Sequence, residues 1–266
     1  MSFFNKKTPL QKELEKVQEK EKTFLLKHFK KTNNALDEKL MQKIPVKLKN
    51  TLNTAFIKAF TAIFENGTNI IEKTFKRQKL EQDFLVNKSV FEIKQSSKTL
   101  RSFSKKAKNT GNKNLAISGT IGVGMGALGI GLPDIPIFTG MILKNIYEIS
   151  LNYGYKFDTE EEKYFILMLI QGALSHGEQL YSTNQKLNDF IKFSQLPPEY
   201  NQKQQIEKTA ELLSTELICI KFLQGIPLIG VVGGAYNAVY MQKTTSFAAI
   251  KYKYRFIFDQ LNNNHH

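Results

Sequence analysis

The apolar residues of this chain recur at helical spacing over most of its length. The clearest case follows Pro45, where apolar positions are separated by three or four residues: Leu48, Leu52, Phe56, Phe60, Ile63 and Phe64. Residues at these intervals lie on one face of an α-helix. Gly67 stands where a C-cap glycine is expected, so the pattern predicts a helix between Pro45 and Gly67.

Further helices are predicted along the chain, and almost no stretch shows the alternation of a β-strand. Helical character covers residues 10–31, 70–108, 139–153, 164–174, 198–219 and 248–261. The helix at 10–31 is expected to be charged and solvated, with a weakly membrane-attracted surface helix as the alternative. The acid-rich residues 158–162 are expected to form the first turn of the helix that contains 164–174. We therefore predict an all-α, multi-helix single domain at residues 45–262, preceded by a charged N-terminal helical extension at 1–44 and followed by a tail at 263–266.

Two uncharged, glycine-rich segments stand out, at residues 115–132 and 222–242, and the first has six glycines in eighteen residues. Glycine is costly in an isolated helix, so this density predicts close helix packing. The expected packing residues are Gly119, Gly122, Gly126, Gly129, Gly230, Gly233 and Gly234. The two segments are predicted to form a packed, hairpin-like core. Because eighteen helical residues span roughly 27 Å against a bilayer core of about 30 Å, partial insertion is favoured over a full membrane span.

A competing interpretation of the first segment is nucleotide binding. Residues 124–129 match the GxGxxG dinucleotide fingerprint, and Glu148 follows about twenty residues later. That fingerprint requires a strand before it and an uninterrupted helix after it, whereas Pro133 and Pro136 follow here. Nucleotide binding is therefore disfavoured, and we predict no cofactor and no metal site.

The chain carries fourteen more lysines and arginines than acids, so an anionic partner is expected. Between residues 73 and 113, twelve basic residues stand against three acids. A basic cluster beside an apolar segment is typical of proteins that bind anionic membrane surfaces, at about 1 kcal/mol per Lys or Arg. Nucleic acid is disfavoured because no recognition module accompanies the cluster, while a plain solvated basic face stays open. The predicted lipid-binding residues are Lys94, Lys98, Arg101, Lys105, Lys106 and Lys108.

The single cysteine, Cys219, fits a reducing compartment, and the first residues lack the apolar core of a secretion signal. His265 and His266 match the end of a purification tag and are not considered as site residues. We therefore expect a cytoplasmic protein that is peripheral at the inner face of the cell membrane.

Two residues are candidates for acid-base chemistry. Asp134 is the only charged residue between positions 115 and 143, and a carboxylate in such surroundings is expected to cap, to pair or to react. Pro136 and the apolar helix that follows favour capping. His176 has no nucleophile or metal motif beside it. The two residues support an alternative function, a hydrolase or lipid-modifying enzyme with a site near Asp134.

Several of these motifs resemble the EcsC protein family. They are Gly131-Leu132-Pro133-Asp134-Ile135-Pro136, Tyr147-Glu148-Ile149, Tyr153-Gly154, the acidic residues 158–162, and the block 221–240 with Pro227-Leu228-Ile229-Gly230, followed by Tyr254-Arg255. The resemblance covers roughly residues 73–258 and leaves out the N-terminal helix. The family is named for a bacterial protein encoded beside an ABC-type exporter, which implies a bacterial cytoplasmic protein that works near the membrane. The resemblance implies no catalytic residues.

The expected function is therefore that of a membrane-associated helical protein without an assigned reaction. It is expected to bind anionic membrane lipids through the basic cluster and the glycine-rich segments. An ABC-type transporter or another membrane protein is the alternative partner.

Overall fold

The computed structural model describes residues 7–29, 44–65, 69–105, 134–223 and 234–263. Within these ranges a further helix covers residues 97–105, and the other helices are α1 (Pro9–Phe29), α3 (Val46–Glu65), α4 (Asn69–Glu72), α5 (Arg77–Ile93), α7 (Asp134–Asn152), α8 (Glu160–Leu174), α9 (Gly177–Phe193), α10 (Gln202–Leu223) and α11 (Gly234–Asn263). No strand occurs in the described ranges, and the predicted all-α fold is confirmed.

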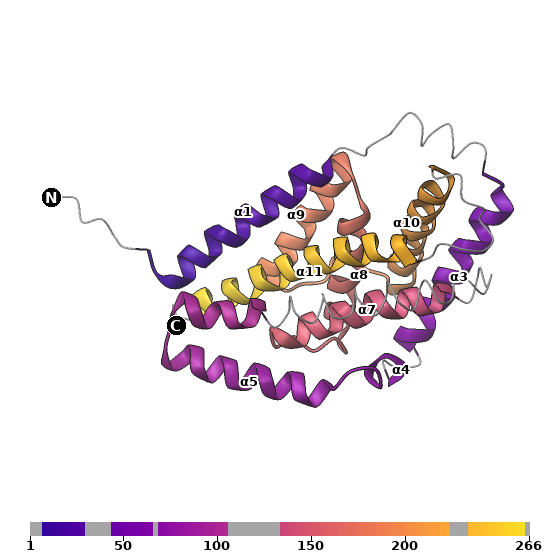
Figure 1. Ribbon diagram of the computed structural model, residues 1–266. Coiled ribbons are helices and arrows are strands. Elements are labelled where there is room, and N and C mark those ends of the chain that lie inside the picture. The colour runs from indigo at the N-terminus through magenta and orange to yellow at the C-terminus, as the bar shows by residue number, and fades with distance from the viewer. Residues whose placement is uncertain (1–6, 30–43, 66–68, 106–133, 224–233, 264–266) are drawn as a thin grey trace.

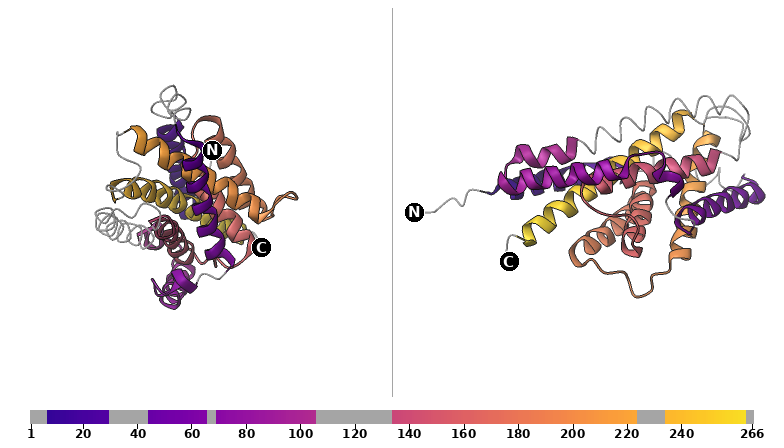
Figure 2. Two further views of the ribbon diagram at one scale, coloured as in Figure 1. Left: turned by 90° about the vertical axis from the view of Figure 1, so that its right-hand side faces the viewer. Right: turned by 90° about the horizontal axis from the view of Figure 1, so that it is seen from below.

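The long helix α11 and its neighbour α7 form the centre of the bundle (Figure 1). Helices α1, α7, α8 and α9 all contact α11, while α10 packs against both α3 and α8. On its other sides α7 contacts α3 and α5. The left-hand view of Figure 2 again shows α5 at the edge of the bundle. One face of α5 is therefore turned away from the other helices.

Aromatic side chains fill much of the core between these helices. Tyr147 of α7 stacks on Phe157 with their ring centroids 4.1 Å apart. Phe24 of α1 stacks on Phe247 of α11 at 4.7 Å. These four rings are buried, and burial of large apolar surfaces of this kind is the main favourable contribution to folding.

Local chemistry explains the turn between α7 and α8. Gly154 has a φ of +85°, and a Cβ at this position would lie 2.2 Å from the Phe84 ring of α5. Only glycine combines this backbone conformation with so close a contact. The side chain of Thr159 then caps α8 by accepting a hydrogen bond from the backbone N–H of Glu162, at 3.2 Å. The three glutamates of the acidic run form the first turn of this helix as predicted, while Asp158 precedes the helix.

The structure corrects the expectation that the N-terminal helix is solvated. α1 buries one full face against α11 and α9, made of Leu10, Glu13, Val17, Glu21, Phe24 and Leu25. The single helical region expected at 70–108 is instead divided into α4, α5 and the helix at 97–105. The helix α9 was not predicted, and α11 (Gly234–Asn263) joins the described end of the second glycine-rich segment to the helix predicted at 248–261.

Most of the glycine-rich sequence lies outside the described residues. This applies to the whole first segment and to much of the second, with the predicted packing residues Gly119, Gly122, Gly126, Gly129, Gly230 and Gly233. Gly234 is the first residue of α11. The hairpin-like core therefore stays a prediction. Among the described helices, none combines the length and the apolar character needed to cross a bilayer.

Candidate functional site

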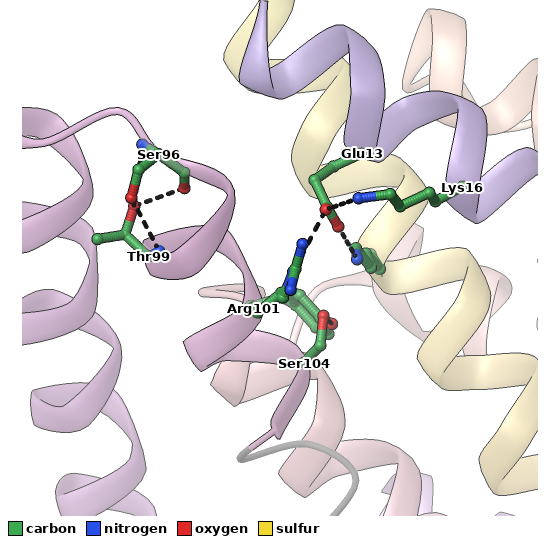
Figure 3. Close-up of polar contacts among 8 residues, drawn as sticks. Glu13, Lys16, Ser96, Thr99, Arg101 and Ser104 are labelled. Atoms are coloured by element: carbon green, nitrogen blue, oxygen red, sulfur yellow. Dashed lines mark hydrogen bonds and ion pairs between the residues drawn. The ribbon is translucent and has the colours of Figure 1, made fainter.

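Four of the six predicted lipid-binding residues lie at one corner of the molecule, and Lys106 and Lys108 lie outside the described residues. Lys94 follows the last turn of α5, and the next helix, 97–105, carries the other three. A reciprocal cap positions this helix (Figure 3): the Ser96 backbone N–H donates to Thr99 Oγ1 at 3.2 Å, and the Thr99 N–H donates to Ser96 Oγ at 3.3 Å. Lys94, Lys98 and Lys105 are exposed.

The helix α5 adds an apolar face to this basic corner. Its exposed apolar side chains, with their exposed fractions, are Leu85 (60%), Val86 (62%), Val90 (48%) and Ile93 (88%). At 100° per residue they cover an arc of about 140° on one side of the helix. We call these four residues the outer face of α5. The outer face and the exposed lysines form the candidate site.

The opposite side of α5 holds it to the core. Phe91 is buried, and Leu80 and Phe84 pack against the core cluster. Sequence reasoning missed the outer face because α5 has apolar residues on both sides. The local pattern shows this two-sided character, but only the fold shows which side α7 covers.

Arg101 differs from the neighbouring lysines because it also contacts a buried acid. Its Nε lies 3.6 Å from Oε1 of Glu13 in α1 (Figure 3). The Glu13 carboxylate, with a side chain only 2% exposed, also accepts hydrogen bonds from Lys16 at 2.8 Å and Lys253 at 2.7 Å. Arg101 therefore has a structural partner, and its replacement would change more than the surface charge.

The basic residues near the end of α11 do not belong to the surface cluster. Lys251, Lys253 and Arg255 are largely buried, and each pairs with an acid from another helix. Lys251 pairs with Glu21 of α1, and the Arg255 guanidinium lies 2.7 Å from the carboxylate of Glu162 in α8. Burial lowers the pKa of Lys251 to about 8, against the opposing effect of Glu21. These cations join α11 to its neighbours.

The two acid-base candidates lie at the starts of α7 and α9. Asp134 is the first residue of α7, and its side chain lies outside the described part of the structure. His176 precedes α9, and both of its ring nitrogens face protein groups. Nδ1 lies 3.1 Å from the backbone oxygen of His28, and Nε2 lies 3.7 Å from Oε2 of Glu216. Tyr240 donates a hydrogen bond to the same carboxylate oxygen at 3.2 Å. This arrangement ties the ends of α1 and α9 to α10.

Comparison with known proteins identifies the family. The model of the EcsC protein family matches residues 10–257. Protein EcsC of Bacillus subtilis (strain 168) is 24% identical over 194 residues, which cover 70% of this chain and 74% of the relative. No solved structure matches the chain. The family match includes α1, so the expectation that the N-terminal helix lies outside the resemblance is wrong. Since the match covers most of the sequence, the chain belongs to the EcsC protein family.

Proposed function

We propose that this protein attaches to an anionic membrane surface through the outer face of α5 and the lysines beside it. The observation that carries the proposal is the exposure of four aliphatic side chains on one helix face, with Ile93 at 88%. Exposed apolar side chains gathered on one face and rimmed by polar residues are typical of interaction sites. The outer face is followed at once by Lys94, with Lys98 and Lys105 on the next helix.

The lysines and the outer face of α5 act at different distances from a membrane. Lysines near an anionic surface contribute about 1 kcal/mol each and act over roughly a Debye length. Insertion of the aliphatic side chains then adds up to about 1.5–3 kcal/mol for each side chain that becomes fully buried. These magnitudes suit reversible attachment of an interfacial helix, which needs no membrane-spanning segment.

Vesicle flotation tests the apolar contribution. The wild-type protein should float with vesicles that contain phosphatidylglycerol and should not float with pure phosphatidylcholine. Ile93→Asp should reduce flotation strongly, because a charged side chain replaces the most exposed residue of the outer face. Phe193→Asp is the matched control, since Phe193 is also an exposed apolar residue (66%) but lies on α9, apart from α5 in Figures 1 and 2.

A second pair of variants tests the charge contribution. Lys98→Glu combined with Lys105→Glu should weaken binding and its dependence on salt. The same charge change at the exposed Lys186 and Lys203, on α9 and α10, should have a smaller effect. Arg101 is left intact because it contacts Glu13. Absence of wild-type binding to anionic vesicles, or equal losses in the test and control variants, would refute the proposal.

A further inference from the structure

A groove of about 760 Å³ lies between α1, α11 and the helix at 97–105. Its volume falls within the range of about 300–1,000 Å³ that is typical of small-molecule sites. Residues of α1 between 17 and 28 line one side, and residues of α11 between 239 and 253 line the other. No residue of α5 is among those that line it, so the groove is separate from the outer face of α5.

The groove has an apolar floor. Val17 and Phe24 of α1 are buried there. Tyr153 and Ser104 also line the groove, and the Tyr153 hydroxyl donates a hydrogen bond to Ser104 Oγ at 3.3 Å. Ala249 and Ile250 of α11 continue the apolar surface and are partly buried. Such a floor favours contact with a hydrocarbon chain, because removal of apolar surface from water lowers the free energy.

The charged residues of the groove are all basic. Lys20, Lys27, Lys243 and Lys253 line it, and no aspartate or glutamate is found among the described lining residues. Lys253 is paired with Glu13, whereas Lys20 and Lys27 of α1 are exposed. A groove with charge of one sign concentrates ligands of the opposite sign.

The pKa of His28 reflects the positive charge at one end of the groove. Burial has the largest effect on this pKa, and the charges of Lys243 and Lys27 act in the same direction, so the pKa of His28 is lowered to about 4. The imidazole is therefore neutral near neutral pH, and it packs against the Phe24 ring in a tilted arrangement with ring centroids 4.4 Å apart. A neutral ring beside two lysines can hydrogen-bond an anion without adding charge of its own.

We propose that the groove binds a single-chain amphiphile with an anionic head, in the first place a fatty-acid carboxylate. The head lies at the end formed by Lys27, His28 and Lys243. The hydrocarbon chain lies over Phe24 and Ile250 toward the other end. This inference is independent of membrane attachment, because it concerns a monomeric ligand in a different part of the molecule.

Calorimetric titration of the full chain with dodecanoate, below its critical micelle concentration and without vesicles, tests the proposal. Binding should be saturable. Lys27→Glu should weaken it by about tenfold or more, because a charge-assisted hydrogen bond is replaced by repulsion. Lys22→Glu, which makes the same charge change on α1 outside the groove, should leave the affinity nearly unchanged. Ala249→Phe should also weaken binding by narrowing the groove beside Ile250, with the melting temperature as the check on folding.

Two other probes separate the contributions of head and chain. Dodecyltrimethylammonium has the same chain with a cationic head and should not bind. Inorganic phosphate alone should bind more weakly than dodecanoate, because it lacks the chain. Failure of dodecanoate to bind, equal losses in Lys22→Glu and Lys27→Glu, or equal binding of the cationic amphiphile would overturn the inference. Ile93→Asp should keep dodecanoate binding even where it loses vesicle binding, so the two proposals can fail separately.

Discussion

Replacement of Glu13 by glutamine provides a quantitative test of how α1 is held to the bundle. The Glu13 carboxylate is buried and accepts hydrogen bonds from Lys16 and Lys253 (Figure 3). The Lys253 side chain is itself only 9% exposed. Glu13→Gln keeps nearly the same volume but removes the negative charge. It therefore leaves the ammonium of Lys253 buried without its partner, which is a costly state.

The pKa of Glu13 gives the size of the expected loss of stability. Burial by itself raises this pKa, but the hydrogen bonds from Lys16 and Lys253 outweigh burial and lower the pKa from 4.5 to about 2. Since one pKa unit corresponds to about 1.4 kcal/mol, ionised Glu13 stabilises the folded state by about 3 kcal/mol at neutral pH. The folded pKa lies below the unfolded value. The stabilisation is therefore complete above the unfolded pKa of 4.5 and is lost as the pH falls toward 2.

Urea unfolding of the wild type and Glu13→Gln, at about pH 7 and again at about pH 3, measures this effect. The difference in the free energy of unfolding should be about 3 kcal/mol at the higher pH and clearly smaller at the lower one. Glu15→Gln is the control, because Glu15 lies on the same helix but forms a solvent-exposed pair with Lys7 and should change stability little. A difference that does not vary with pH, or equal effects of the two substitutions, would refute the reasoning.

Three other substitutions test close packing and capping. Gly172→Ala should lower the melting temperature, because its Cβ would lie 2.6 Å from the buried Phe247 ring, and overpacking of this kind typically costs about 1–3 kcal/mol. Gly140→Ala should instead raise stability by about 0.5–1 kcal/mol, since no described atom lies within 4 Å of the new methyl group; thermal unfolding of both variants should give opposite signs. Thr159→Ala should cost about 1 kcal/mol in urea unfolding, because the Glu162 N–H loses its cap, and an unchanged midpoint would contradict that assignment.

Helix formation was predictable wherever the signals are local. The residues after Pro45 form α3 on the expected face, and the acidic run begins α8. α9 was missed because its buried face includes Thr183 and Asn184 between Leu180 and Leu187. Polar residues at these two positions interrupt the apolar spacing that marks an amphipathic helix. Their burial depends on neighbours from other parts of the chain.

The burial of α1 could not be predicted for a similar reason. Glu13 and Glu21 lie on the buried face, where a local pattern of charges indicates solvent. They are buried because Lys253 and Lys251 pair with them from the far end of the chain. An ion pair between residues more than two hundred positions apart leaves no local periodicity. The candidate site was therefore located in part, through its lysines, while the outer face of α5 required the fold.

The buried ion pairs also bear on where the positive charge of the chain is found. Each of the three pairs made by α11 removes one cation and one acid from the surface, so the excess of fourteen positive charges is carried by the remaining residues. The basic end of α11 cannot supply electrostatic attraction to an anionic surface, because its charges are already neutralised inside the bundle. Exposed residues such as Lys94, Lys98 and Lys105 keep their full effect on the surrounding potential. The proposed attraction to anionic lipid should therefore depend on these lysines rather than on the conspicuous cations of the C-terminal helix.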